Sequence, residues 1–326
     1  MPRLLCSGSF LASHFAALGL ASLEQCCESR QALSASSPNV SGVGRRYQTV
    51  SFLSDLGTVD EGVGVVRSVL REMAPHVAII DLTHDIAPFD VRAGSLALAR
   101  AIQYVASGVV LAVVDPAVGT DRRAIAIEVA DGEGVLVGPD NGLLAPAVAM
   151  AGGAGRSVVL SNTAFHAEAA GPTFSARDIF APITAHLCNG VDLAELGELV
   201  DPITLLPGVV PLSRIDGDDL VTEVMWVDRF GNAQLNIGPE EIEQWGQTVR
   251  VRFGDNDPRS ASVAHTFDHV GAGIGLVVDS YGMVTVCLAR GSAAAELGLN
   301  PGTEVRLSKS DGPQGFATAV GFPTRR

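Results

Sequence analysis

The apolar run VVLAVVD at residues 109–115 decides the fold class of this chain of 326 residues. An unbroken run of this kind suits a parallel strand that is buried on both faces. Two shorter strand-like runs precede it, at 49–53 and 76–82, and each leads into a segment whose apolar residues recur at helical spacing, at 63–73 and 91–105. Strands that alternate with helices predict a parallel sheet with helices on both faces.

The same pattern continues after this run. Strands are expected at 124–129 and 134–137, followed by a helix from about Asn141, and 177–188 is predicted to be the last helix of the unit. Near residues 201–212 three prolines and a glycine predict a linker.

Beyond the linker the sequence no longer shows helical periodicity. Short β-rich runs at 220–227, 248–253, 275–279 and 283–288 are separated by turns rich in Gly and Asp. This pattern is typical of a small all-β domain, either a barrel or a sandwich.

The composition narrows the class of protein. Apolar residues make up 47% of the chain, and 36 acidic against 22 basic residues give a formal net charge of −14. This balance argues against a nucleic-acid partner, because neutralising phosphates requires clustered Lys and Arg. No apolar stretch approaches the roughly 20 residues of a membrane span. The five cysteines include the adjacent Cys26 and Cys27, and their odd number suggests neither a disulfide framework nor a zinc site. We expect a cytoplasmic protein with reduced thiols.

Residues 1–46 differ in composition from the rest, being rich in Ser, Ala and Cys and lacking Asp. The mildly apolar run at 4–23 allows a secretory signal as one interpretation. Four polar residues interrupt it, however, and no A-x-A cleavage site follows. We therefore expect residues 1–46 to be a disordered extension or the product of an upstream start codon.

Three predicted strands end at or near an aspartate: Asp55, Asp81 and Asp115. Ligands of open α/β sheets gather at the carboxyl ends of parallel strands, where a carboxylate can bind ribose hydroxyls, bind a metal or act as a base. The competing interpretation of each is a cap for the next helix. Arg122 follows Asp115 by seven residues, across a turn rich in Pro and Gly, so it can fold back and pair with it. Such a pair either fixes a water molecule or only shapes the loop.

Several familiar motifs are absent from the sequence. Neither G-x-G-x-x-G nor a P-loop occurs between a strand and a helix, which excludes dinucleotide and P-loop nucleotide sites. Neither H-E-x-x-H nor C-x-x-C occurs, and His265 and His269 lie in a predicted β region, so we expect no metal. For His84 a structural role is favoured over catalysis.

Seven ordered blocks carry a resemblance to a known family. They are SDLGTVD (54–60), DLTHDIAPFDVRAG (81–94), VVDPAVGTDRR (113–123), VGPDNG (137–142), TFSARDIFAP (173–182), VDRFGN (227–232) and DSYG (279–282). Together they resemble the S-adenosyl-L-methionine hydroxide adenosyltransferase family, the hydrolase relatives of fluorinase and chlorinase. The resemblance runs from about residue 49 to residue 308.

The resemblance implies an α/β chain with three parts. An N-terminal α/β/α sandwich with a mainly parallel sheet would occupy 47–200, the linker 201–212, and a smaller C-terminal all-β barrel domain 213–326. The family acts without a metal or cofactor as a homotrimer, with the ligand between one subunit's first domain and its neighbour's second. Its members displace methionine from C5′ of S-adenosyl-L-methionine (SAM), using water or hydroxide in the hydrolases and halide in the halogenases.

By resemblance, four residues of the first domain would bind substrate. Asp55 would accept the two ribose hydroxyls and Asp60 would meet the methionine ammonium. Phe89 would cover the ribose and the reaction centre, with Thr173 nearby.

Five residues of the second domain would complete the substrate site. Asp228 would meet the methionine amino group, Asn232 the adenine edge and Ser280 the carboxylate end. Phe267 would stack on adenine, and the backbone of Ser292 would meet the same base. For Phe89 and Phe267 the alternative is ordinary core packing.

The resemblance assigns catalysis to Asp115, Arg122 and Ser175. The halogenases carry Tyr where this chain has Asp115, and a carboxylate would repel an incoming halide, so hydroxide chemistry is favoured. The hydrolases carry His where this chain has Ser175, and serine cannot accept a proton near neutral pH. His166 or His186 could replace that base in space.

We therefore expect a metal-independent enzyme that hydrolyses SAM to adenosine and L-methionine. The alternatives are a SAM-dependent halogenase, a binding protein for adenosyl ligands that has lost turnover, or a protein that acts on another nucleoside.

Overall fold

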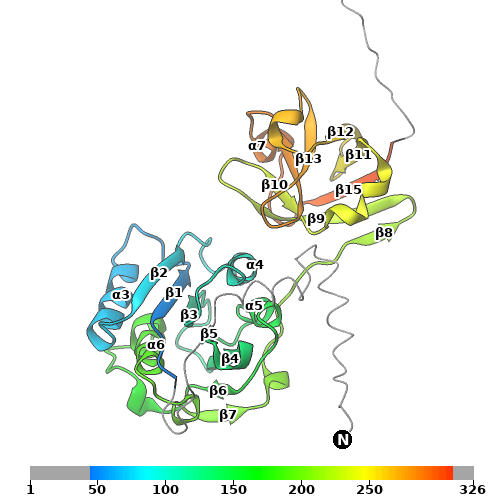
Figure 1. Ribbon diagram of the computed structural model, residues 1–326. Helices are drawn as coiled ribbons and strands as arrows, with labels where there is room; N and C mark the ends of the chain where they lie inside the picture. Colours follow the sequence, from blue (N-terminus) through cyan, green and yellow to red (C-terminus); the bar gives the residue numbers. More distant parts are fainter. Residues whose placement is uncertain (1–44, 311–326) are drawn as a thin grey trace, which may run out of the picture. The chain divides into compact units, whose positions relative to one another are not determined.

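The computed structural model of this protein describes residues 45–310. The described chain divides into two compact units, one that ends at Val210 and one that begins at Pro211. Figure 1 shows the elements of each unit, and each unit is described by itself. Of the predicted N-terminal extension only Arg45 and Arg46 are described; its other residues lie outside the described range.

The first unit is built on a seven-stranded sheet. Its strands are β1 (Thr49–Ser54), β2 (Ala78–Thr83), β3 (Val109–Val113), β4 (Ala124–Val129), β5 (Gly134–Pro139), β6 (Ser157–Val159) and β7 (Glu198–Val200), in the order β2-β1-β3-β5-β4-β6-β7. Strands β2, β1, β3 and β5 are parallel, and the pairings beyond β5 are antiparallel. Only residues 130–133 join β4 to β5, which is too short for the crossover that a parallel pair requires.

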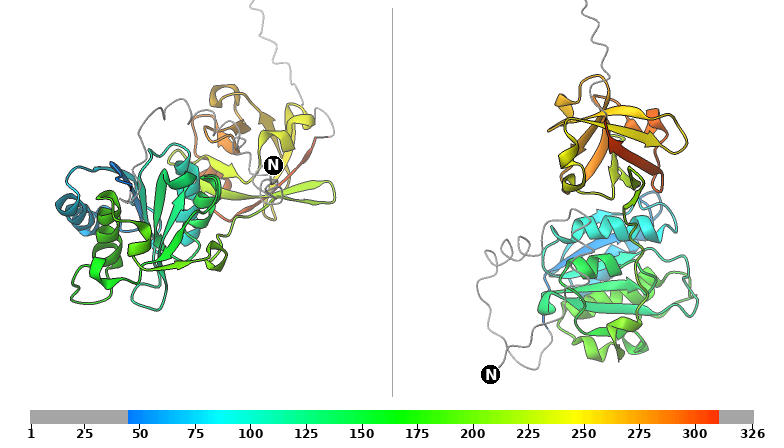
Figure 2. Two further views of the ribbon diagram at one scale, coloured as in Figure 1. Left: turned by 60° about the horizontal axis from the view of Figure 1, so that its bottom comes forward. Right: turned by 90° about the vertical axis from the view of Figure 1, so that its right-hand side faces the viewer.

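Helices cover both faces of this sheet (Figures 1 and 2). Alternate residues of β3 point to opposite faces. Val109, Leu111 and Val113 join a core with α3 (Gly62–Met73) and α6 (Ala181–Cys188), whereas Val110 and Ala112 join a core with α4 (Val91–Ile102) and α5 (Ala145–Met150). The predicted α/β class and the double burial of this strand are confirmed.

Two helix boundaries differ from the expectation. The helix predicted from Asn141 begins at Ala145, because the Asn141 side chain instead holds a turn: its amide donates to Val114 O at 2.9 Å and its carbonyl accepts from Leu143 N at 3.1 Å. The helix predicted at 177–188 starts as a π-helix, η3 (Ala176–Phe180), and continues as α6. Pro182 has no N–H to donate to Asp178 O, and that carbonyl accepts from Ala167 N at 2.9 Å instead.

The second unit is a closed barrel. Its strands are β8 (Arg214–Asp216), β9 (Asp219–Val227), β10 (Ala233–Leu235), β11 (Thr248–Phe253), β12 (Arg259–Val263), β13 (Ile274–Val278), β14 (Val284–Leu288) and β15 (Glu304–Lys309). Seven of them pair in the order β10-β14-β13-β12-β11-β15-β9, and a further β9–β10 pairing closes the ring, with β8 added outside β9. Of the two predicted architectures, barrel and sandwich, the unit is therefore a barrel. Its described residues also form the α-helix α7 (Ala293–Leu297).

Short 3-10 turns connect these elements. They lie at Ala130–Gly132, Thr163–Phe165, Leu193–Glu195, Pro202–Thr204, Pro239–Glu241, Glu243–Trp245 and Phe267–His269.

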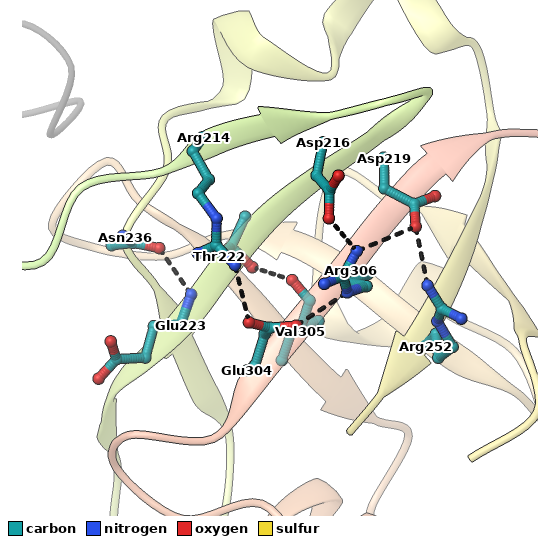
Figure 3. Close-up of polar contacts among 10 residues, drawn as sticks. All are labelled: Arg214, Asp216, Asp219, Thr222, Glu223, Asn236, Arg252, Glu304, Val305 and Arg306. Carbon is teal, nitrogen blue, oxygen red and sulfur yellow. Dashed lines mark hydrogen bonds and ion pairs between the residues drawn. The ribbon is translucent and has the colours of Figure 1, made fainter. Parts of the chain in front are cut away.

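Ion pairs fasten the β8–β9 hairpin to β15 (Figure 3). Arg306 on β15 contacts Asp216 at 2.7 Å and its near neighbour Glu304 at 2.8 Å, and Arg252 on β11 contacts Asp219 at 2.9 Å. Hydrogen bonding to the Arg306 guanidinium lowers the pKa of both the Asp216 and the Glu304 carboxyl. β8 is therefore held by ion pairs of its side chains as well as by its backbone hydrogen bonds to β9.

Within residues 45–310, every helix is too short or too polar to cross a bilayer.

Candidate active site

The candidate residues of the first unit lie at one edge of the sheet. β1 and β3 are parallel neighbours with Ser54 opposite Val113, so the residues that follow both strands emerge together. Asp55 N donates to the carbonyl oxygen of Val113 at 3.4 Å, and Val113 precedes Asp115 by two residues. Asp55 and Asp115 therefore follow neighbouring strands at one edge of the sheet, whereas Asp81, which was predicted at a strand end, lies inside β2.

Asp115, Arg122 and Ser175 form one hydrogen-bonded group. Arg122 Nε donates to Asp115 Oδ1 at 3.0 Å, Arg122 also donates through a terminal nitrogen to Oδ2, and Ser175 Oγ donates to Oδ2 at 3.2 Å. This two-point contact is the strong form of an Arg–carboxylate pair. The side chains of Asp115 and Arg122 are only 4% and 9% exposed. The Arg122 guanidinium also lies 5.4 Å from the centre of the Phe180 ring.

The turn after β3 aims Arg122 back at Asp115. Val118 N donates to Asp115 O, and Thr120 Oγ1 accepts from Arg122 N, each at 3.3 Å. Gly119 has a φ of +78°, and a Cβ there would lie 3.2 Å from Pro172 O. A glycine at this position therefore allows the segment before Ser175 to pack on the turn.

Asp55 is tied to Phe89. Phe89 N donates to Asp55 Oδ2 at 2.9 Å, and Phe89 has a positive φ of 69°, a conformation that L-residues with a Cβ rarely adopt. Its ring is 70% exposed, so core packing is wrong for this residue. A carboxylate has about four acceptor positions, so Asp55 keeps acceptor capacity for a ligand.

The capping interpretation is wrong for all three strand-end aspartates. α3 has Glu61 at its N-cap without a side-chain bond, and α4 is capped by Asp90, whose carboxylate accepts from Ala93 N. Asp81 contacts Arg67 and His84 instead.

Asp60 and Thr173 are both exposed. Gly62 follows Asp60 closely, and a Cβ on it would lie 3.8 Å from Phe174 Cζ, next to Thr173. The two segments therefore approach each other, without a hydrogen bond between Asp60 and Thr173 among the described residues.

The two candidate substitutes for the family histidine are His166 and His186. Within the described residues, neither makes a hydrogen bond to Asp115, Arg122 or Ser175. His186 packs against Phe165 with ring centres 4.9 Å apart, and the helical segment from 176 to 186 puts it on the order of 15 Å from Ser175. Burial lowers the pKa of both imidazoles.

In the second unit Asp228, Asn232 and Ser292 lie together. Asp228 Oδ1 accepts from Asn232 N, and Oδ2 accepts from Asn232 Nδ2, both at 2.8 Å. Between them Gly231, at a φ of +84°, touches Ser292: a Cβ on it would lie 2.0 Å from Ser292 Oγ. Ser292 caps α7 by accepting from Ala295 N.

Phe267 and Ser280 lie on other loops of the barrel. Phe267 opens a 3-10 turn and is 46% exposed, so core packing is wrong for it as well. Ser280 is exposed in the turn that Asp279 holds by accepting from Tyr281 N and Met283 N. Sequence reasoning missed Phe230, a 77% exposed aromatic in the same turn as Asp228 and Asn232. Its place inside the VDRFGN block was the signal that could have found it.

Among residues 45–310, no group of three His, Cys, Asp or Glu side chains is arranged to hold a metal ion. Burial raises the pKa of Cys188 to about 12 and that of Cys287 to about 11, so neither sulfur is a thiolate near neutral pH.

Comparison with protein families identifies both units. The model of the SAM hydroxide adenosyltransferase N-terminal domain matches residues 50–197, and that of the C-terminal domain matches residues 222–306. The chain belongs to the SAM hydroxide adenosyltransferase family. All twelve candidate residues fall inside the two matched ranges.

Members of the SAM hydroxide adenosyltransferase family with curated names include close relatives of this chain. The (R)-S-adenosyl-L-methionine hydrolase of Salinispora tropica is 44% identical over 260 residues, which cover 79% of this chain and 97% of the relative. That of Thermus thermophilus is 40% identical, covering 79% and 98%. The fluorinase of Actinopolyspora mzabensis is more distant, at 25% identity over 80% of this chain and 97% of its own.

Solved structures agree with this family assignment. A conserved protein from Thermotoga maritima superposes with a TM-score of 0.73 at 31% identity, covering 79% of this chain and 99% of its own. A conserved protein from Thermus thermophilus gives 0.63 at 37% identity, covering 80% and 99%.

Proposed function

We propose that this protein hydrolyses SAM to adenosine and L-methionine by attack of water at C5′. The observation that carries the proposal is the buried Asp115–Arg122 pair with Ser175 bound to it, at the carboxyl edge of the sheet. It occurs in a chain whose family relatives are named SAM hydrolases.

The proposed step is a displacement. The water oxygen bonds to C5′ as the C5′–S bond breaks, the electron pair goes to sulfur to give the neutral thioether of methionine, and the attacking water releases one proton to solvent. The sulfonium is already a good leaving group, so the enzyme must mainly align the water with the C5′–S bond and exclude other solvent. Asp115 would hold that water, with its own carboxylate fixed by Arg122 and Ser175.

The carboxylate also favours water over halide. Asp115 is almost completely buried, where a charge is screened less than at the surface, so it would repel an approaching anion. A halogenase requires the opposite preference.

The binding roles are part of the same proposal. We assign the ribose hydroxyls to Asp55, the methionine ammonium to Asp60, and the cover of the reaction centre to Phe89 and Thr173. In the second unit we assign the methionine amino and carboxylate ends to Asp228 and Ser280. The adenine would meet Asn232, Phe267 and Ser292.

The proposal includes a homotrimer, in which a ligand would use first-unit residues of one copy and second-unit residues of its neighbour. It also includes a cytoplasmic location and a reaction without metal or cofactor.

A product assay tests the function. Purified protein is incubated with SAM in chloride-free buffer and again with chloride, and the products are separated by liquid chromatography with mass spectrometry. We expect adenosine and methionine in both buffers. A chloride-dependent product, 5′-chloro-5′-deoxyadenosine, would identify a halogenase instead, and tight binding of SAM without product would identify a binding protein.

A further inference from the structure

A buried histidine lies beneath the turn that carries Asp55. His84 is 5% exposed and its ring meets the edge of Phe52, with centroids 4.6 Å apart. Its Nδ1 lies 2.8 Å from Ser54 Oγ, and its Nε2 lies 3.1 Å from Asp81 Oδ1. The proposed reaction uses neither His84 nor Ser54.

Hydrogen bonds connect Leu56, Ser54 and His84. Leu56 N donates to Ser54 Oγ at 3.3 Å, and the Ser54 hydroxyl is hydrogen-bonded to His84 Nδ1. His84 Nε2 has no hydrogen-bond partner among the described residues, but the Asp81 carboxylate lies beside it. Arg67 pairs with that carboxylate at 3.3 Å.

Ser54, His84 and Asp81 lie together, but they are not a nucleophilic triad. Ser54 is completely buried at the end of β1, so no substrate atom can reach its oxygen. The backbone of His84 instead contacts the turn that carries Asp55: Gly57 N donates to His84 O at 2.8 Å. His84 therefore binds the turn on both sides of Asp55, at Ser54 and at Gly57.

We propose that His84 is a positioning residue that, through Ser54 and Gly57, holds Asp55 in the orientation that accepts the ribose hydroxyls. Asp81 lies beside the ring, and Arg67 holds Asp81. The inference rests on the proposed function, because it takes the ribose contact of Asp55 from it. A histidine that only filled the core would stabilise the fold without affecting which ligand atoms are recognised.

The test compares two ligands that differ only in the hydroxyls at issue. Binding of adenosine and of 2′,3′-dideoxyadenosine is measured by calorimetry for the wild type, Ser54→Ala, Asp81→Asn, His84→Ala and His84→Asn. Thermal unfolding of each variant is recorded beside it. Ser157→Ala is the matched control, because Ser157 is another buried serine of the same sheet, on β6, whose Oγ has no hydrogen-bond partner among the described residues.

We expect Ser54→Ala to weaken adenosine binding by about tenfold, the effect of one hydrogen bond. Asp81→Asn, which breaks no hydrogen bond to the ring, should have a smaller effect. Binding of the dideoxy ligand should be almost unchanged. His84→Asn, whose amide can still meet the Ser54 hydroxyl, should retain more adenosine affinity than His84→Ala. Ser157→Ala should bind both ligands as the wild type does.

Two results overturn the inference and are distinguishable from each other. If the wild type binds both ligands equally, Asp55 does not read the ribose hydroxyls, and this inference falls with that assignment. The second result is that the wild type prefers adenosine over the dideoxy ligand and Ser54→Ala either keeps the same preference or binds both ligands more weakly by the same factor. His84 is then only a core residue, and the proposed function stands.

Discussion

Asp115 and Arg122 form a pair in which each partner depends on the other. Both are nearly buried, and removing one partner of a buried ion pair leaves an uncompensated charge, which typically costs about 3–5 kcal/mol of stability. Their spacing of seven residues predicted the contact, and the prediction is confirmed. The pair therefore links stability to the proposed chemistry, and experiments on it must measure both.

Asp115→Asn should lower kcat by about 10²–10⁴-fold, the usual contribution of a group that handles the reacting proton or water. SAM affinity should change little, because the assigned binding residues are elsewhere. The matched control is Asp140→Asn, which disrupts the ion pair of another buried aspartate with the partly exposed Arg123, without touching Ser175. It should lose stability and keep most of its turnover. Unchanged turnover in Asp115→Asn would refute the assigned role.

Ser175→His should raise kcat if the missing base limits the rate. Ser175 Oγ lies 3.2 Å from Asp115 Oδ2, so an imidazole introduced there would lie beside the proposed water. The rate should then rise with pH around the ordinary histidine pKa of about 6.5. Steady-state rates across pH, with thermal unfolding as the control for folding, measure this. No gain from a folded variant would mean that another group accepts the proton.

Phe89→Gly separates the ring from the strained backbone. Glycine adopts a positive φ freely, so this variant should be about 1 kcal/mol more stable than Phe89→Ala, which keeps the strain. Both should raise KM for SAM by losing the aromatic cover. Urea unfolding and initial rates check the two effects. SAM binding at the wild-type level in both variants would contradict the assigned cover.

At the scale of elements, sequence patterns located strands with a clear apolar signal, including the edge strand β2, but not the short edge strands β7 and β8. The run at 109–115 identified β3, because a doubly buried strand is apolar throughout. β7 and β8 are three residues long and largely exposed, so they carry little apolar signal. The helix predicted at 177–188 begins as a π-helix because Pro182 cannot donate to Asp178 O, which accepts from Ala167 N instead. This tertiary contact leaves no signal in the local sequence pattern.

The β8–β9 hairpin should loosen at low pH. Arg306 lowers the pKa of Asp216 and Glu304, so their contribution is complete above the unfolded values of 3.8 and 4.5 and is lost as pH falls through the lower folded values. The protection factors of the hairpin amides in hydrogen exchange, which correct for the intrinsic rate at each pH, should therefore fall between about pH 5 and pH 2. Arg306→Met should remove most of this pH dependence.

Arg259→Met is the control for that experiment. Arg259 lies on β12 of the same barrel and has no ion pair among the described residues, so its loss should leave the hairpin's pH dependence intact. Equal exchange in Arg306→Met and the wild type at every pH would show that the ladder alone holds β8.

At the scale of the molecule, the ordered blocks of sequence identified the family more surely than composition did. Composition argued against nucleic-acid binding and a membrane span, and the linker was predicted from prolines near the end of the first unit. The proposed homotrimer would depend on surfaces between copies of the chain, which periodicity within one chain does not describe.

Deleting residues 1–44 should leave fold and SAM hydrolysis intact, because both family domains lie beyond them. The deletion should stop there. Arg45 pairs with Glu133 at 2.8 Å, and the buried Tyr47 donates to Gly132 O at 3.0 Å. Deletion to residue 47 should therefore lower the thermal unfolding temperature, whereas deletion to 44 should not. Insoluble or inactive protein after the shorter deletion would contradict this expectation.

The most direct test of the central claim follows the oxygen atom. The protein is incubated with SAM in water enriched in a heavy oxygen isotope, and the products are analysed by mass spectrometry. Attack of water at C5′ predicts that adenosine carries the heavy oxygen at O5′ and that methionine carries none. Unlabelled adenosine, or 5′-methylthioadenosine together with labelled homoserine, would contradict the account.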